Sequence, residues 1–437
     1  MLNWNNDMNE YVNQAIVDGV DVERSLEKNR WVAVFAVALT ATVFTTTEFI
    51  PIGVLRYLSA DIGVSEGTAG YSVTAPGLLA AIAAPAVALF ARGADRRVVL
   101  IMLTLALLAS NAIAMLSPNF WTLLVARAIF GVGVGGFWTI GAGLGASLVK
   151  SQHIGTATAI IFAGVSLGML IGGPAGVFIG DTLGWRAAFG FALAASVVGL
   201  IAQVLALPSL RLPGTLVARD VFSLLSERNG LLLMLAMFAA LCGQFAAYTF
   251  VTPFLAQASG FSDRTISIVL LGYTLIGLGG NFLAGATSAK HGIPTFTVSA
   301  AAIAVSLILL PPTSHLSAVQ LLLVAVWGTA YGAFPVALQM AIARISHRSG
   351  DGAMALFVAN YQISIAVGSG AGALLVDRFG LNGTLYCGAV ATVLAIILVT
   401  FTGRAGKQPD EHEVAPNAMS RARSGPAEVT VDSRTTL

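Results

Sequence analysis

Twelve apolar runs of helix-spanning length occupy most of the chain, and they constrain its fold more than any other feature. A helix needs about 20 predominantly apolar residues to cross a bilayer. With 56% hydrophobic and 10% charged residues, the chain is far less polar than soluble domains, in which about 25% of residues are charged. The sequence therefore predicts an all-α integral membrane protein. The runs cover residues 31–58, 67–91, 98–117, 120–149, 154–180, 186–207, 230–257, 265–289, 293–310, 316–344, 352–376 and 382–402.

Basic residues are distributed unequally between the loops on the two sides of the predicted bundle. Residues 1–30 are polar and contain no apolar core of signal-peptide length, so we place them on the inside. On that assignment ten Lys and Arg residues lie in the inner loops and four in the outer loops, as the positive-inside rule requires. We therefore expect both termini in the cytoplasm. The bases form no patch, so we expect no nucleic-acid partner.

The two halves of the chain repeat each other at an offset of 196 or 197 residues. Leu58, Gly63, Ser65, Gly131, Gly135 and Phe137 recur 197 residues later, and Asp181 and Gly184 recur 196 residues later. Such parallel repeats place a substrate site between the halves near the membrane midplane. We predict two pseudo-symmetric six-helix halves, residues 31–207 and 230–402. A cytoplasmic linker, 208–229, joins them, and cytoplasmic tails, 1–30 and a disordered 403–437, flank them.

Glu48 and Arg127 are the acid and the base that lie deepest within the apolar runs. A charge at the bilayer centre costs about 2.5 to 3.5 kcal/mol on insertion scales, so each needs a partner or a function. The two lie at similar depth from the outer side. In the repeat Glu48 aligns with Gln244, and Arg127 aligns with Val324, so both charges belong to the first half alone. Two interpretations stay open: proton coupling, or a permanent ion pair that joins two helices.

Aromatic and amide side chains within the runs are candidates for substrate binding. They are Trp138, Gln244, Tyr248, Trp327, Tyr331, Asn360 and Gln362. Trp138 shares a helical face with Arg127. Buried amides often only join helices, with a mean worth of about 0.6 kcal/mol, so packing and binding are equally open for each. Together the set suits a neutral polar molecule with a flat or amphipathic face.

Glycine occurs at every fourth position of the fifth run, from Gly164 to Gly184. The intermediate members of this glycine ladder are Gly168, Gly172, Gly176 and Gly180. Small residues at this spacing allow a neighbouring helix to approach closely, and Pro174 permits a bend. Plain helix packing explains the ladder, and the alternative is that its smooth face lets helices slide during a change of state.

These motifs resemble the major facilitator superfamily. Within it, the resemblance is to the twelve-span drug and metabolite:proton antiporters of the sugar-efflux and purine-ribonucleoside-efflux branch. It covers residues 31–402. Its motifs are Thr47-Glu48-Phe49-Ile50-Pro51, Ala94-Asp95-Arg96-Arg97, Arg127 with Gly131 and Gly133, and Gly172-Gly173-Pro174 with Gly176. The loop motif lacks its usual glycine between the arginines, and the antiporter motif lacks its closing glycine pair.

The resemblance implies the major facilitator fold in the bacterial inner membrane, with the first and fourth spans lining a central cavity. Glu48 and Arg127 are then expected to meet there and to couple transport to protons. It also implies that Asp95, with Arg96 and Arg97, closes the cytoplasmic side in one state. The alternative for these three residues is that they only set the topology.

The sequence therefore predicts a secondary active transporter and not an enzyme, because the runs contain no nucleophile, metal cluster or cofactor motif, and the histidines have no metal-ligand spacing. We expect proton-coupled efflux of a small polar or amphipathic molecule, such as a nucleoside, sugar or drug, by alternating access. The expected partners are that substrate, protons and the lipid bilayer, with no cofactor, and the chain is expected to be a monomer. The alternative is a proton-independent uniporter of a similar solute.

Overall fold

The computed structural model describes residues 30–91, 93–141, 143–210, 223–345 and 350–402. Within these ranges the chain consists of helices joined by short turns, and no strand is present. Most of both predicted tails and the middle of the predicted linker lie outside the described residues, so the assignments of 1–30, 208–229 and 403–437 stay predictions. The long apolar helices confirm the predicted all-α membrane architecture.

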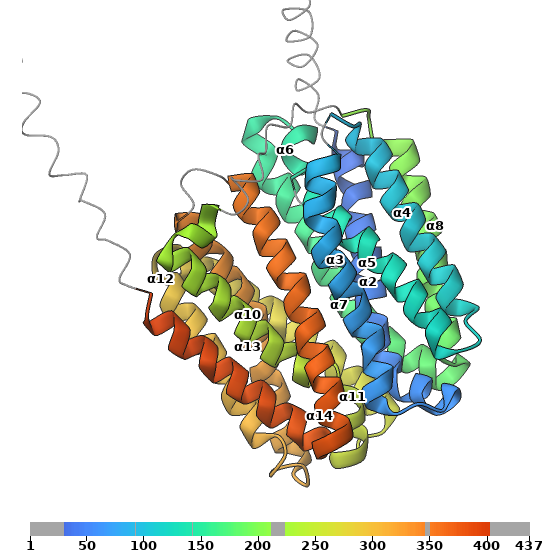
Figure 1. Cartoon of the computed structure of the whole chain (residues 1–437), viewed down its shortest axis with the longest axis vertical. Coiled ribbons are helices and arrows are strands. Elements are labelled where there is room, and N and C mark those ends of the chain that lie inside the picture. The colour runs from blue at the N-terminus through green and yellow to red at the C-terminus, as the bar shows by residue number, and fades with distance from the viewer. Residues whose placement is uncertain (1–29, 92, 142, 211–222, 346–349, 403–437) are drawn as a thin grey trace, which may run out of the picture.

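The first half, coloured blue to green in Figure 1, has six long helices among its described residues. They are α2 (Trp31–Ile62), α3 (Glu66–Phe90), α4 (Arg96–Met115), α5 (Phe120–Gly141), α7 (Ile154–Leu183) and α8 (Trp185–Ala206). Two short helices, α6 (Gly145–Leu148) and η1 (Ser151–His153), lie between α5 and α7. Each long helix corresponds to one apolar run of the sequence.

The second half contains two helices that each hold two membrane spans. Its elements are η2 (Ser223–Ser226), α10 (Arg228–Tyr248), α11 (Val251–Pro253), the π-helical turn η3 (Phe254–Ala258), α12 (Asp263–Leu309), α13 (Ser317–Ile345) and α14 (Gly350–Thr400). The backbone leaves the helical region at His291 of α12 and at Gly380 of α14. The described part of the second half thus also crosses the membrane six times, and the two halves together have twelve spans.

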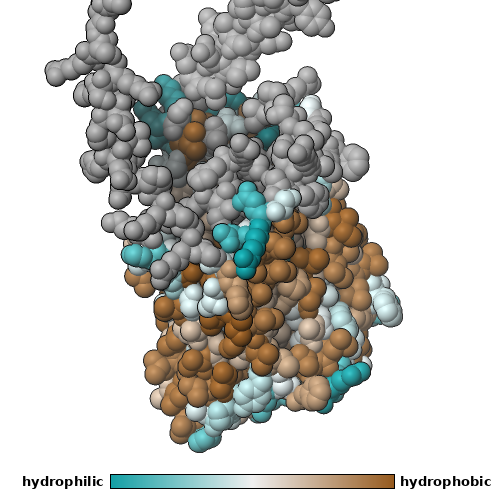
Figure 2. Space-filling view, turned by 60° about the vertical axis from the view of Figure 1, so that its left-hand side comes forward, coloured by the Kyte–Doolittle hydropathy of each residue, from teal (hydrophilic) through white to brown (hydrophobic). Residues whose placement is uncertain are grey.

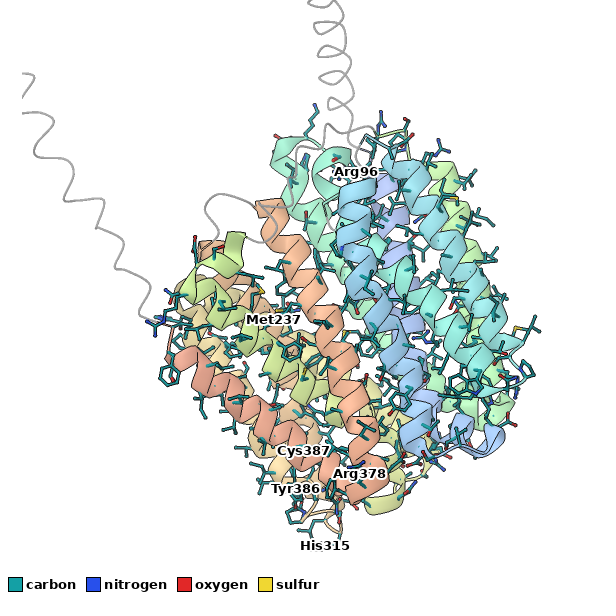
Figure 3. All side chains as sticks on the ribbon, viewed as in Figure 1. Arg96, Met237, His315, Arg378, Tyr386 and Cys387 are labelled. Atoms are coloured by element: carbon teal, nitrogen blue, oxygen red, sulfur yellow. The ribbon has the colours of Figure 1, made fainter. Side chains whose placement is uncertain are left out.

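Hydrophobic side chains cover the sides of the helical bundle. Figure 2 shows them as a broad brown band with hydrophilic residues toward the lower edge of the visible face. Leu205, Phe282 and Trp121 are among the most exposed of these side chains. In Figure 3, Arg96 lies at one end of the bundle and His315 and Arg378 lie at the other. We call the first the inner end and the second the outer end, following the positive-inside rule.

The repeated sequence motif marks the turns between the first two helices of each half. Gly63 and Gly260 have φ of 73° and 69°, a left-handed conformation that glycine adopts without a Cβ penalty. Two residues later Ser65 and Ser262 cap α3 and α12, each accepting a hydrogen bond from the backbone N–H three residues on. The repeated residues therefore mark the end of one helix and the start of the next.

Four helices form the boundary between the two halves. In Figure 1, α3 and α14 lie side by side between the blue-green and the yellow-red helices, and they pack together; α7 packs against α12. Within the halves α2 packs on α7, and α10 packs on α14 in the same way. The first helix of each half is thus held by the fifth helix of its own half.

The halves are bonded to each other between the level of Glu48 and the outer end. The contacts are an ion pair of Arg56 with Asp263 and hydrogen bonds of Ser65 with Asp377, Glu66 with Gln257, Thr74 with Ser369, and Thr252 with the Ile52 carbonyl. By contrast, the apolar cluster at the inner end of the first half has no member from the described second half. The structure is therefore in an outer-closed conformation.

Candidate functional site

A small cavity lies between the two halves at the level of Glu48. It is lined by Glu48, Phe49 and Ile52 of α2, Val73, Pro76 and Gly77 of α3, Arg127 of α5, Phe245 of α10 and Ile365 of α14. Its volume, taken as the space that the centre of a water-sized sphere can occupy, is about 10 Å³, which is roughly enough for one water molecule. In the outer-closed conformation the cavity accommodates water or one small group, and a larger solute needs it to open.

Arg127 is completely buried, and the neighbouring backbone holds its guanidinium. Nε donates to the Ser72 carbonyl at 2.9 Å and Nη1 to the Thr47 carbonyl at 3.2 Å. The charge lies 4.5 Å above the Phe130 ring, a favourable cation–π arrangement. Nη2 has no hydrogen-bond partner among the described residues. Arg127 therefore ties α5 to α2 and α3, and its Nη2 group can still donate to water, a carboxylate or a solute.

Glu48 is partly buried and contacts the second half of the protein. Its Oε1 accepts a hydrogen bond from Nε2 of Gln362 at 3.4 Å. Glu48 and Arg127 line the same cavity, but the structure does not pair them as ions. A permanent ion pair between these helices is thus absent in the outer-closed conformation. Backbone carbonyls accept from Nε and Nη1 of Arg127, and Nη2 stays unpartnered beside the cavity.

Gln244, the repeat counterpart of Glu48, is a buried and fully bonded amide. Its oxygen accepts from Nε1 of Trp327 at 2.7 Å, and its nitrogen donates to the Tyr273 hydroxyl at 2.9 Å. Tyr248 stacks on Tyr273 with ring centroids 5.0 Å apart. Both hydrogen-bonding ends of Gln244 are therefore used within the second half, and the amide serves to hold the aromatic rings together.

An aromatic cluster of the second half borders the cavity through Phe245. Its members are Phe245, Tyr248, Tyr273, Trp327, Tyr331 and Tyr361, with Tyr331 and Tyr361 sharing a hydrogen bond of 2.8 Å between their hydroxyls. The structure thus brings together three of the predicted aromatic candidates. Tyr273 and Tyr361 are cluster members that the sequence analysis missed, although each is a hydroxyl-bearing ring within an apolar run.

Two predicted binding residues lie elsewhere in the structure. Trp138 follows Arg127 by eleven residues, or about 16 Å along a helix, and it packs against Phe137 and Phe162 within the first half. Asn360 donates to the Met234 carbonyl at 2.9 Å, so it joins α14 to α10. Like the other five predicted binding residues, neither lines the cavity in this conformation.

The glycine ladder is the face of α7 on which α2 packs. A Cβ added at Gly164, Gly168, Gly172 or Gly176 would lie within 2.9 Å of the α2 backbone or of a Cβ on α2. Gly173, by contrast, faces Leu270 and Tyr248 of the second half at ordinary contact distance. Pro174 lies inside α7 between these contacts. The ladder therefore positions the segment of α2 that carries Glu48.

The second half has the same contact at two glycines of α14. Gly368 and Gly372 lie 196 residues after Gly172 and Gly176, and added Cβ atoms there would lie 2.5 and 2.7 Å from the Cys242 and Ala246 carbonyls of α10. Gly370, between them, faces Thr74 of the first half instead. The spacing of four that packs α7 on α2 is thus present in the second half as well.

Asp95 caps α4 and fastens it to the chain after α8. Its Oδ1 accepts from the backbone N–H of Arg97 at 2.9 Å and of Leu210 at 3.0 Å. Arg96 donates its N–H to the Leu210 carbonyl, and the Arg97 side chain donates to the Val204 carbonyl. These bonds lie within the first half and its continuation, so the gating role of the three residues stays a prediction.

Asp95→Ala is expected to destabilise the protein by about 1 kcal/mol, because it removes a helix N-cap. Asp95→Asn keeps the capping oxygen and is expected to restore most of the stability. Denaturant unfolding in detergent, followed by circular dichroism, measures both. Equal stability of the alanine variant and the wild type would show that the cap contributes nothing to the fold.

Comparison with known proteins agrees with this architecture. The family model described as Major Facilitator Superfamily matches residues 32–353. A Pseudomonas aeruginosa protein named "Transcription regulatory protein OpdE" is 31% identical over 386 residues, which are 87% of this chain and 96% of that protein. The purine ribonucleoside efflux pump NepI of Salmonella enteritidis is 30% identical over 372 residues, 84% of this chain and 93% of that protein.

Two solved structures have the same fold. A D-xylose-proton symporter superposes with a TM-score of 0.70 and 16% identity, covering 85% of this chain and 97% of its own. A bacterial homologue of the human lysosomal transporter Spinster, in an inward-facing and occupied conformation, superposes with a TM-score of 0.73 and 15% identity, covering 87% and 99%. The chain is thus a multi-pass membrane transporter of small molecules and not an enzyme. It belongs to the major facilitator superfamily.

Proposed function

We propose that the chain exports a small polar or amphipathic solute in exchange for protons, by alternating access between its two halves. The observation that carries the proposal is the position of Glu48: a carboxyl group lining the cavity between the halves, beside Arg127 and in contact with Gln362. An intramembrane carboxyl group is expensive unless it is used. Glu48 is the proposed proton site, and Arg127 is proposed to take part in the same coupling.

The proposed solute is neutral and has a flat face, as a nucleoside does. Support comes from the aromatic cluster next to the cavity, because planar molecules stack on such rings, and from the relative named as a purine ribonucleoside efflux pump. Tyr248, Tyr331 and Trp327 are the proposed contacts in a more open conformation. Gln244 is proposed to orient these rings, since both ends of its amide are bonded within the cluster.

We place the chain in the bacterial inner membrane as a monomer, with both termini in the cytoplasm. The unequal distribution of basic residues between the loops supports this orientation. Asp95, Arg96 and Arg97 then lie at the cytoplasmic end, where we propose that they help to close the cavity when the outer end opens. Domain boundaries at residues 31–207 and 230–402 belong to the same proposal.

Glu48→Gln is expected to reduce transport driven by a pH gradient, because glutamine cannot exchange a proton. The expected reduction is at least about tenfold, which lies in the usual range of coupling between two ligands. Purified protein in liposomes with an imposed pH gradient and radiolabelled purine nucleoside provides the measurement. Exchange of labelled for unlabelled nucleoside without a gradient is expected to continue. Asp181→Asn is the matched control, since Asp181 lies exposed near the end of α7 and does not line the cavity.

Gradient-driven transport by Glu48→Gln at the wild-type rate would contradict the proposed proton site. Wild-type transport that ignores the gradient would instead identify the chain as a proton-independent uniporter. Absence of nucleoside transport, with retained transport of a sugar or an amphipathic drug, would overturn the proposed solute and leave the proton site standing.

A further inference from the structure

One short segment of α14 touches three different neighbours of the cavity. Asn360 donates to the Met234 carbonyl of α10, and the Tyr361 hydroxyl bonds to Tyr331 of α13. The Ser364 carbonyl accepts from Sγ of Cys242, again on α10. Gln362, between these anchors, points the other way and donates to Glu48 of the first half. The segment is therefore fastened within the second half and reaches the first half through one amide.

The position of Gln362 is also defined from the side of the first half. A Cβ added at Gly77 of α3 would lie only 2.7 Å from the Gln362 carbonyl oxygen, so the two backbones are in close contact there. Gln362 itself is 3% exposed. The other polar contacts between the described halves, such as Arg56 with Asp263, lie farther toward the outer end. Gln362 thus makes the inter-half contact that reaches the deep carboxyl group.

The strength of this contact depends on whether Glu48 carries a proton. A hydrogen bond to an ionised carboxylate is roughly twice as strong as one between neutral groups. A proton removes the charge, and the oxygen that still accepts from Gln362 is then a neutral, weaker acceptor. The Gln362–Glu48 contact is therefore strongest when Glu48 is ionised.

The geometry points to Gln362 as the residue that couples the ionisation of Glu48 to the closing of the two halves. The ionised carboxylate holds α14 against α2 in the outer-closed conformation, and a proton on Glu48 releases it. This inference rests on the proposed function in one respect, the assignment of the proton to Glu48. Because coupling is reciprocal, anything that separates Gln362 from Glu48 also changes how readily Glu48 takes up a proton.

Other groups that face Glu48 do not provide this coupling. Arg127 of α5 belongs to the same half as Glu48, so its attraction does not change when the halves separate. Tyr361 of α14 shares its hydroxyl with Tyr331, and Tyr248 of α10 packs on Phe49. α3 and α7 present Val73 and glycines, and the titratable groups of α4 and α8 lie at the helix ends. Among the described residues of the second half, Gln362 is the one with a hydrogen bond to Glu48.

The test measures conformation, so it does not need transport. Spin labels at Ala60→Cys and Ser317→Cys, exposed positions of the two halves near the outer end, report the ratio of outer-closed to outer-open protein. Both labels are introduced into a protein whose native cysteines are removed by Cys242→Ser and Cys387→Ser. In the wild type the ratio is expected to rise about fivefold or more from pH 5 to pH 8, the lower end of coupling factors between two sites.

Gln362→Leu is expected to reduce this pH-dependent change to less than about twofold, below the lower end of coupling factors between two sites. Ser369→Ala is the matched control, because it removes an uncharged inter-half hydrogen bond to Thr74 from the same helix. It is expected to lower the ratio at every pH and to keep the full pH-dependent change. Gln362→Met replaces the leucine variant if the latter is not monodisperse.

The full pH-dependent change in Gln362→Leu or Gln362→Met would overturn the inference. Glu48→Gln separates this failure from that of the proposed function. If Glu48→Gln loses the pH-dependent change and the Gln362 variants keep it, the proton site stands and the coupling role of Gln362 fails. If Glu48→Gln keeps the change, the proposed proton site fails as well, and a wild type without any change overturns both.

Discussion

Gly168→Val is expected to lower the yield of folded protein several-fold. An added Cβ at Gly168 lies 2.5 Å from the Thr45 Cβ and 2.6 Å from the Thr42 carbonyl oxygen of α2. Both atoms belong to the helix backbone or are attached to it, so they cannot give way as a flexible side chain would. Overpacking of this kind costs about 1 to 3 kcal/mol and occasionally more, which is a large share of the stability of a typical domain, roughly 5 to 15 kcal/mol.

Gly155→Val provides the matched control for this prediction, because Gly155 lies in the first turn of the same helix and an added Cβ meets no atom within 4 Å. The fraction of monodisperse protein after detergent extraction, measured by size-exclusion chromatography, is expected to fall for Gly168→Val and to stay near wild type for Gly155→Val. Equal recovery of the two would show that α2 and α7 can separate without loss of the fold, which is what a sliding role for the ladder requires.

The sequence predicted the fold well because few backbone structures are stable in contact with lipid. Every span must satisfy its backbone internally, so apolar length alone predicts helices, and the repeat at Gly63, Ser65, Gly260 and Ser262 has a direct cause in helix ends and caps. Where the backbone is irregular the prediction is weaker. The π-helical turn at Phe254–Ala258 begins inside the predicted seventh run, 230–257, and ends one residue beyond it. Composition cannot distinguish such a turn from a regular helix.

The sequence predicted how deep the candidate site residues lie in the membrane, but not which of them bond to each other. Glu48 and Arg127 line one cavity, as expected from their similar positions along their helices, which can be read from the sequence. The bonds of Arg127 to the Ser72 and Thr47 carbonyls depend on helix packing, which brings those carbonyls to the guanidinium. The contact of Gln362 with Glu48 joins residues 314 positions apart. Nothing in either local sequence indicates which amide of the second half reaches the carboxyl group.

Gly77→Val is expected to leave each half folded and to prevent the halves from closing. An added Cβ at Gly77 lies 2.7 Å from the Gln362 carbonyl oxygen, 2.9 Å from the Ala366 Cβ and 3.0 Å from the Ala366 nitrogen. All three atoms belong to α14, so the clash lies between the halves and disappears when they separate. An overpacking cost of about 1 to 3 kcal/mol then changes the ratio of the two conformations about 5- to 150-fold.

The contrast with Gly168→Val distinguishes packing within a half from packing between halves. Gly77→Val is expected to give normal monodisperse protein, an outer-end distance shifted toward the open conformation at every pH, and transport reduced at least about tenfold, since a population shift of that size removes one state of the cycle. Gly272→Val, on α12, where an added Cβ meets no atom within 4 Å, controls for valine in a span. A wild-type distance distribution with full transport in Gly77→Val would mean that α3 and α14 need not meet at Gln362, and that outer closure depends on the ion pair of Arg56 with Asp263 and its neighbours alone.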